Sequence, residues 1–133
     1  MKRIIFTLVI SLCLLGTSTA FAGDNLANFV WNTNVYLGNE GGTSYFADQL
    51  DLDIGLTKYY LTVNGSVTVN IGGSIPCAGT GFITASDDYF LGMQCGILTI
   101  NTFIDGQTLN GDIDVYQGDI DISTGSLTYV GMY

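Results

Sequence analysis

Histidine is absent from this chain of 133 residues, and other residue types are scarce, with three Lys+Arg and a single proline. Histidine is the usual base beside a serine or cysteine nucleophile, so the common nucleophile–base pairs cannot be assembled. Pairs of aspartates are present, but aspartates that alternate along a strand are typical of a solvated surface. We therefore predict a non-enzymatic protein that has no catalytic residues and no cofactor.

Two of the three basic residues begin a predicted secretion signal, which spans residues 1–22. The pair Lys2-Arg3 is followed by an apolar run over residues 4–15 and by the small-residue cleavage sequence Ala-Phe-Ala at residues 20–22. The apolar run is shorter than the roughly 20 residues that a spanning helix needs. We predict no membrane span after signal removal, and a secreted, periplasmic or cell-envelope location.

The remaining residues, 23–133, are predicted to form one antiparallel β domain with a strongly acidic surface. Lys58 is its only basic residue against twelve carboxylates, which leaves a net charge of −11. A charge of this sign repels nucleic acids and favours cationic or metal-ion partners. Nucleic acid is therefore excluded from the expected partners.

Cysteine is also rare, and only Cys77 and Cys95 remain once the signal is removed. In an oxidising compartment an isolated pair of cysteines most simply forms a disulfide. Two thiolates in a chain without histidine do not complete the tetrahedral shell of a structural zinc ion. The sequence thus predicts a disulfide between Cys77 and Cys95.

Alternation of apolar and polar residues recurs after residue 22, as in residues 50–54, whereas no stretch has the helical period. Successive hairpins predict an all-β fold, either a single small antiparallel up-and-down barrel or a two-layer sandwich, of about nine or ten short strands. Natural sheets protect open edges with lysine and proline. Their scarcity favours closure into a barrel, or edge pairing with another copy.

Glycine and proline positions predict where the strands turn. Asn64-Gly65 predicts a hairpin with the three-residue loop Val63-Asn64-Gly65, in which Gly65 is left-handed, and the glycines around Pro76 predict a corner or an irregular crossover. The similar units GDIDVYQ, GDIDIST and GSLTYVG begin at residues 111, 118 and 125 and predict a β-meander. Its two turns are expected at residues 117–118 and 124–125.

These two turns would place Asp114 directly opposite Asp121, with Asp112 on the same face. Opposed carboxylates repel each other, and a calcium ion would relieve the repulsion by accepting several oxygen ligands. Asp112, Asp114 and Asp121 are therefore the candidate metal ligands. The alternative is that water and salt screen the acidic face.

The sequence predicts an exported, non-enzymatic β domain with a binding, structural or surface role, and it leaves three more specific functions open. The first is a closed barrel that carries a small apolar ligand among residues such as Trp31, Leu61, Leu98 and Ile113. The second is a self-assembling or adhesin-like matrix component that associates through sheet edges. The third is an acidic sheet that binds calcium. No residue pattern identifies the ligand-binding residues.

Overall fold

The computed structural model describes residues 24–132, and the predicted secretion signal at residues 1–22 lies outside this part of the chain. The described residues form nine β-strands. The strands are β2 (Asp24–Asn32), β3 (Tyr36–Glu40), β4 (Thr43–Leu56), β5 (Leu61–Val69), β6 (Ser74–Ile83), β7 (Tyr89–Cys95), β8 (Leu98–Ile104), β9 (Gly111–Gln117) and β10 (Ile120–Met132). No helix among residues 24–132 has the length and apolar character needed to cross a membrane.

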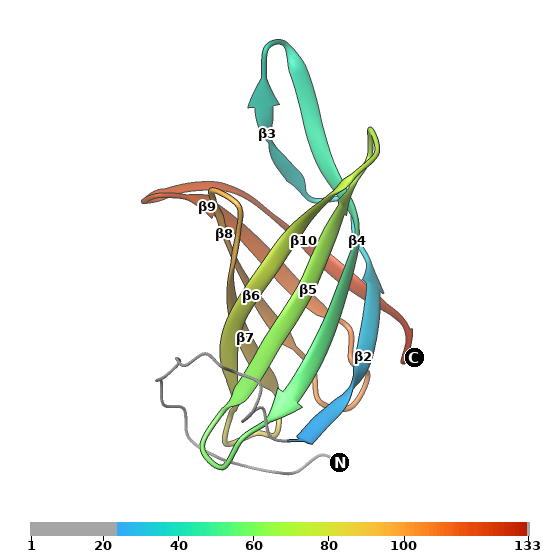
Figure 1. Ribbon diagram of the computed structural model, residues 1–133, viewed down its shortest axis with the longest axis vertical. Helices are drawn as coiled ribbons and strands as arrows, with labels where there is room; N and C mark the ends of the chain where they lie inside the picture. Colours follow the sequence, from blue (N-terminus) through green and yellow to red (C-terminus); the bar gives the residue numbers. More distant parts are fainter. Residues whose placement is uncertain (1–23, 133) are drawn as a thin grey trace.

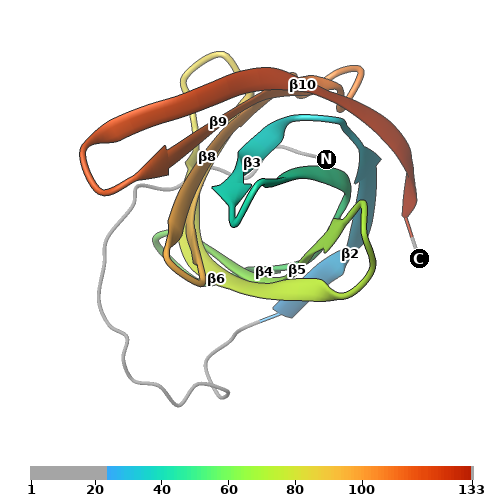
Figure 2. The same ribbon diagram turned by 90° about the horizontal axis from the view of Figure 1, so that it is seen from above.

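The nine strands make one antiparallel sheet, in which eight strands close on themselves. The strand order is β2-β10-β9-β8-β7-β6-β5-β4-β3, and β2 pairs with β4 as well as with β10. This second pairing completes a ring, visible from above in Figure 2, and leaves β3 as an extra strand beside β4. The predicted all-β barrel is confirmed, and the sandwich alternative is wrong.

Side chains fill the interior of the barrel. Inward and outward residues alternate along the regular parts of the strands, so that Leu50, Leu52 and Ile54 of β4 are buried while Asp53 is exposed. Trp31 of β2 is only 1% exposed and packs against Phe29 and other buried residues. Burying an aliphatic or aromatic side chain of this size stabilises the fold by about 1.5–3 kcal/mol. An eight-stranded barrel is narrow enough to be filled in this way.

Gly65 lies within β5, so the hairpin turn predicted at Asn64-Gly65 is wrong. The inward positions of β5 continue without a break through Leu61, Val63, Gly65, Val67 and Val69. Gly65 pairs with Leu52 on β4 and with Cys77 on β6, and a methyl group on it would collide with the carbonyl of Asp51. Glycine is required here because the backbones approach closely, not because the chain turns.

The corner predicted around Pro76 is likewise wrong, because residues 74–83 form the regular strand β6. Pro76 faces outward, and the inward side of this strand carries Gly79 and Gly81. A methyl group on either glycine would run into the backbone of β7. Small inward residues let a strand bend tightly enough for a narrow barrel to close.

The C-terminal meander has two strands, not three. β9 and β10 form the predicted hairpin, although the turn residues are 118–119, one position later than expected. The turn predicted at residues 124–125 is wrong, because β10 runs through them and then pairs with β2. Gly125 again serves close packing, since a Cβ atom there would lie 3.1 Å from the Cβ atom of Val35.

The connection between β8 and β9, residues 105–110, packs against the core at one end of the barrel (Figure 1). Its Leu109 packs against the core, and the Leu109 carbonyl accepts a hydrogen bond of 2.7 Å from Trp31 Nε1. The N–H groups of Thr108 and Gln107 donate to the Asp105 carboxylate and hold the pKa of Asp105 below its ordinary value. The connection is thus tied both to itself and to the core.

The inward glycines give a direct test of the fold. Gly79→Ala should lower the free energy of unfolding by about 2 kcal/mol or more, because overpacking a dense interior costs about 1–3 kcal/mol. The matched control is Gly92→Ala on the neighbouring strand, where the new methyl group would meet only the end of the Asn101 side chain, at 3.2 Å. Urea unfolding of both variants measures the difference. Equal stability of the two variants would contradict the close approach at Gly79.

Candidate functional site: a cavity at the barrel mouth

Four of the connections between strands lie toward the end of the barrel opposite residues 105–110. They are the connections β3–β4, β5–β6, β7–β8 and β9–β10, because an up-and-down barrel places every second turn at the same end (Figure 1). A cavity of about 680 Å³, which we call the mouth cavity, lies at this end and is open to solvent. It is lined by residues 37–40, 45, 69, 71–75, 95–98 and 117.

The floor of the mouth cavity belongs to the hydrophobic core. Leu37, Val69 and Leu98 are buried there, and each comes from a different strand. Cys95 also lies in the floor and is bonded to Cys77, its direct partner across β6 and β7, with a Cα–Cα distance of 4.2 Å. The predicted disulfide is therefore present, and it staples the wall of the barrel just beneath the cavity.

The rim of the cavity carries apolar side chains that water reaches. Ile71 in the β5–β6 connection is 56% exposed, and Ile97 in the β7–β8 turn is 71% exposed. Tyr45 of β4 and Ile75 of β6 are partly buried on the inner wall. An apolar cavity whose rim is also apolar is typical of a site that receives an apolar molecule.

Hydrogen bonds hold the rim connections in place. The N–H of Asn70 donates to the Phe46 carbonyl at 2.9 Å, and the Phe46 N–H donates to Asn70 Oδ1 at 3.0 Å, which fastens the β5–β6 connection to β4. Gly72 and Gly73 have φ values of 104° and 85° and form the tight turn that follows. The cavity is therefore shaped by the fold before any ligand arrives.

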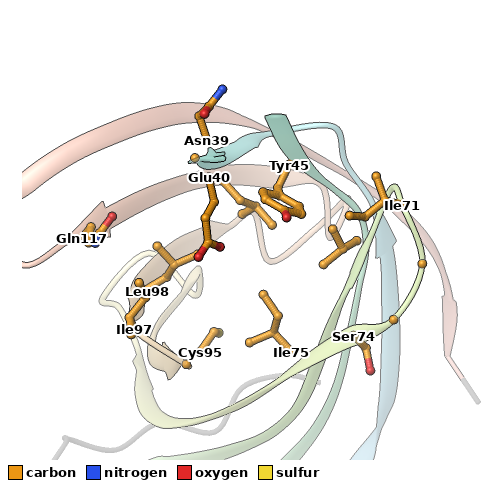
Figure 3. Close-up of a pocket in the computed structure, with 16 residues that line it drawn as sticks. Asn39, Glu40, Tyr45, Ile71, Ser74, Ile75, Cys95, Ile97, Leu98 and Gln117 are labelled. Carbon is orange, nitrogen blue, oxygen red and sulfur yellow. The ribbon is translucent and has the colours of Figure 1, made fainter. Parts of the chain in front are cut away.

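Two of the lining residues, Glu40 and Tyr45, have ionisable side chains, and Glu40 supplies the only carboxylate of the lining. Figure 3 shows this carboxylate turned from β3 into the cavity, toward Leu98, while Asn39 points away. The other polar groups of the lining are neutral, and they include Ser74 and Gln117. The cavity thus combines an apolar wall with a single negative charge.

Of the four residues predicted to surround an apolar ligand, only one lines the mouth cavity. Leu98 lines the mouth cavity, whereas Trp31, Leu61 and Ile113 lie in the packed interior and are at most 1% exposed. Space for a ligand therefore exists at the mouth and not along the barrel axis among these three side chains.

The structure separates two of the predicted calcium ligands. Asp121 pairs with Tyr116, and Asp114 pairs with Thr124 on β10 and Asn101 on β8, so the predicted pairing of Asp114 with Asp121 is wrong. The turn at residues 118–119, one position later than predicted, places Asp121 opposite Tyr116, and a register shift between Asp121 and Ser123 then places Asp114 opposite Thr124. Asp112 and Asp114 do share the outer face of β9. Within residues 24–132 no three acidic, histidine or cysteine residues are grouped so as to hold a metal ion.

Sequence reasoning missed the rim residues Glu40, Ile71 and Ile97. The glycine-rich stretches beside the first two indicate loops, but they do not indicate which loops share an end of the barrel. Successive turns of an up-and-down barrel lie at alternate ends, so a correct count of the strands shows which loops share an end. The false turn at residues 64–65 removed this signal, because it places Ile71 and Ile97 at the end of the barrel opposite Glu40.

Comparison with family models, with curated proteins and with solved structures finds no match for this chain. The function of this chain is therefore inferred from its fold and its cavity. They define a small closed β-barrel that is stapled by one disulfide and has an apolar cavity at one mouth.

The disulfide should stabilise the barrel measurably. It joins residues 18 positions apart, and closing a loop of this length contributes about 3 kcal/mol in the chain-entropy model. The double variant Cys77→Ala with Cys95→Ala should therefore unfold at lower urea concentration than the wild type. Protein made in an oxidising compartment should show no free thiol in denaturant. Two reactive thiols there would contradict the disulfide.

The acidic outer face should respond to cations without selectivity. Because Asp114 and Asp121 are not paired, we expect millimolar calcium and magnesium to raise the melting temperature equally, by screening alone. Thermal unfolding of the wild type and of Asp114→Asn with Asp121→Asn tests this. A larger rise with calcium that the double variant abolishes would restore the calcium hypothesis.

Proposed function

We propose that this protein is an exported, non-enzymatic binding protein that holds a small, largely apolar molecule in the mouth cavity. The mouth cavity itself carries the proposal. Its volume of about 680 Å³ falls within the range of about 300–1,000 Å³ that is typical of small-molecule sites. Aliphatic side chains line it, namely Leu37, Val69, Ile71, Ile75, Ile97 and Leu98, and hydrogen bonds hold the β5–β6 connection beside it.

The exposure of the rim supports the same function. Ile71 and Ile97 expose more than half of their surface although they flank a cavity that could bury them. A bound apolar molecule would remove this surface from water, and each buried methylene group would contribute about 0.8 kcal/mol. Export is supported by the Cys77–Cys95 disulfide, since such bonds persist in oxidising compartments.

Closure of the barrel works against assembly through sheet edges. Each of the eight barrel strands has a partner on both sides, and among the described strands β3 alone has a single partner in the sheet order. Part of β3 is also covered, because Ser123 of β10 donates a hydrogen bond to the Tyr36 carbonyl. A self-assembling matrix or adhesin would need an exposed strand edge to pair with another copy, and the barrel offers little of one.

A neutral fluorescent probe tests the proposal. We expect 1-N-phenylnaphthylamine to bind the folded protein, and Ile71→Ser with Ile97→Ser to weaken binding about tenfold, since each 1.4 kcal/mol of lost contact is a factor of about ten. The matched control is Ile120→Ser, because Ile120 is 69% exposed and lies outside the cavity lining. Absence of probe binding, or equal loss in the control, would contradict the proposal.

A further inference from the structure

A β-bulge in β3 decides which side chain faces the mouth cavity. Tyr36 pairs with Phe46, and Gly38 pairs with Tyr45, so β3 has one more residue than β4 between these two pairs. Tyr45 packs against the core, and its partner Gly38 therefore lies on the inner face. Two residues further on, Glu40 lies on that same face.

The bulge is what turns a carboxylate toward the cavity. Leu37 also faces inward, and in a regular strand Asn39 would follow it on that side. The extra residue shifts the alternation, so that Glu40 faces the cavity and Asn39 faces away from it, as Figure 3 shows. Bulges are a common means of re-aiming a side chain beside a binding site. Glu40 then pairs with Thr43 across the turn that ends the hairpin.

The charge around Glu40 has one sign. No basic residue lines the cavity, and Lys58, the only basic residue after residue 3, lies in the connection β4–β5 at the opposite end of the barrel. The field of the whole domain is negative, with a net charge of −11 after residue 22. A ligand with a negative group would therefore meet repulsion both from Glu40 and from the domain.

We propose that the mouth cavity selects cationic amphiphiles, that is, molecules with an apolar body and an amine or quaternary ammonium group, through the Glu40 carboxylate. The apolar body lies against Leu37, Ile75 and Leu98, and the cationic group lies beside Glu40 at the rim. This inference rests on the proposed function and adds the chemical class of the ligand. Electrostatic complementarity adds specificity more than affinity, so the apolar wall supplies most of the binding.

The test compares three probes on the full-length mature protein. The neutral probe is 1-N-phenylnaphthylamine, and octyltrimethylammonium and octane sulfonate compete with it as cation and anion of equal chain length. We expect the cation to bind more tightly than the anion, with a difference that shrinks as salt rises. Glu40→Gln should weaken binding of the cation about two- to fivefold, as for an exposed ion pair, and should change binding of the neutral probe by less than that.

Charge reversal and a matched control complete the test. Glu40→Lys should reverse the order, so that octane sulfonate binds more tightly than octyltrimethylammonium. Asp119→Asn removes a carboxylate from the neighbouring β9–β10 turn, outside the cavity lining, and should leave the order unchanged. Near-ultraviolet circular dichroism verifies that each variant is folded.

The outcomes separate the two proposals. If the neutral probe binds but the two ions bind equally, or if Asp119→Asn has the same effect as Glu40→Gln, selection by Glu40 is wrong and the apolar binding function stands. If no probe binds to the wild type, the binding function itself is wrong.

Discussion

The pairing of β2 with both β4 and β10 is the constraint on which the rest of the structure depends. From Asn25↔Gly55 to Asn32↔Gln49, β2 follows β4, and its last residues also pair with the end of β10. This double pairing turns an open sheet into a ring, which satisfies the backbone groups that an open edge would expose. It also forces each strand to curve, and the curvature determines which residues the inner face accepts.

Most of the fold was predicted correctly from the sequence, and two of the errors concern glycines that were assigned to turns. Alternation correctly predicts an antiparallel all-β domain, because inward residues such as Leu50 and Leu52 differ plainly from their outward neighbours, and the scarcity of lysine and proline favours its closure into a barrel. Gly65 and Gly125 have two physical uses, a turn and a close approach of backbones, and local sequence favours the turn. Only the folded structure shows that Gly65 lies against the backbone of β4 and that Gly125 lies against Val35. The disulfide was predictable because an isolated pair of cysteines has few alternatives.

The candidate site was harder to predict because it depends on the same count of strands. An extra turn at residues 64–65 moves every later turn to the opposite end of the barrel, so the rim residues Ile71 and Ile97 no longer share a mouth with Glu40. The inward direction of Glu40 depends on a bulge, and no local pattern marks one between Tyr36 and Gly38. A shift of one residue changes the face of every side chain that follows it. An error of one residue in the register leaves the predicted fold class unchanged, but it changes which side chains line a cavity.

One end of the barrel contributes to the stability of the fold, and the other end holds the candidate binding site. At one end, the connection of residues 105–110 contacts Trp31 and Tyr129, so it contributes to the packing of the core. At the other end, the rim side chains are exposed and the floor alone is buried. Substitutions in exposed turns cost little stability, because few buried contacts are lost. The chemistry of the mouth can therefore change while the ring of strands below it, stapled by Cys77 and Cys95, stays the same.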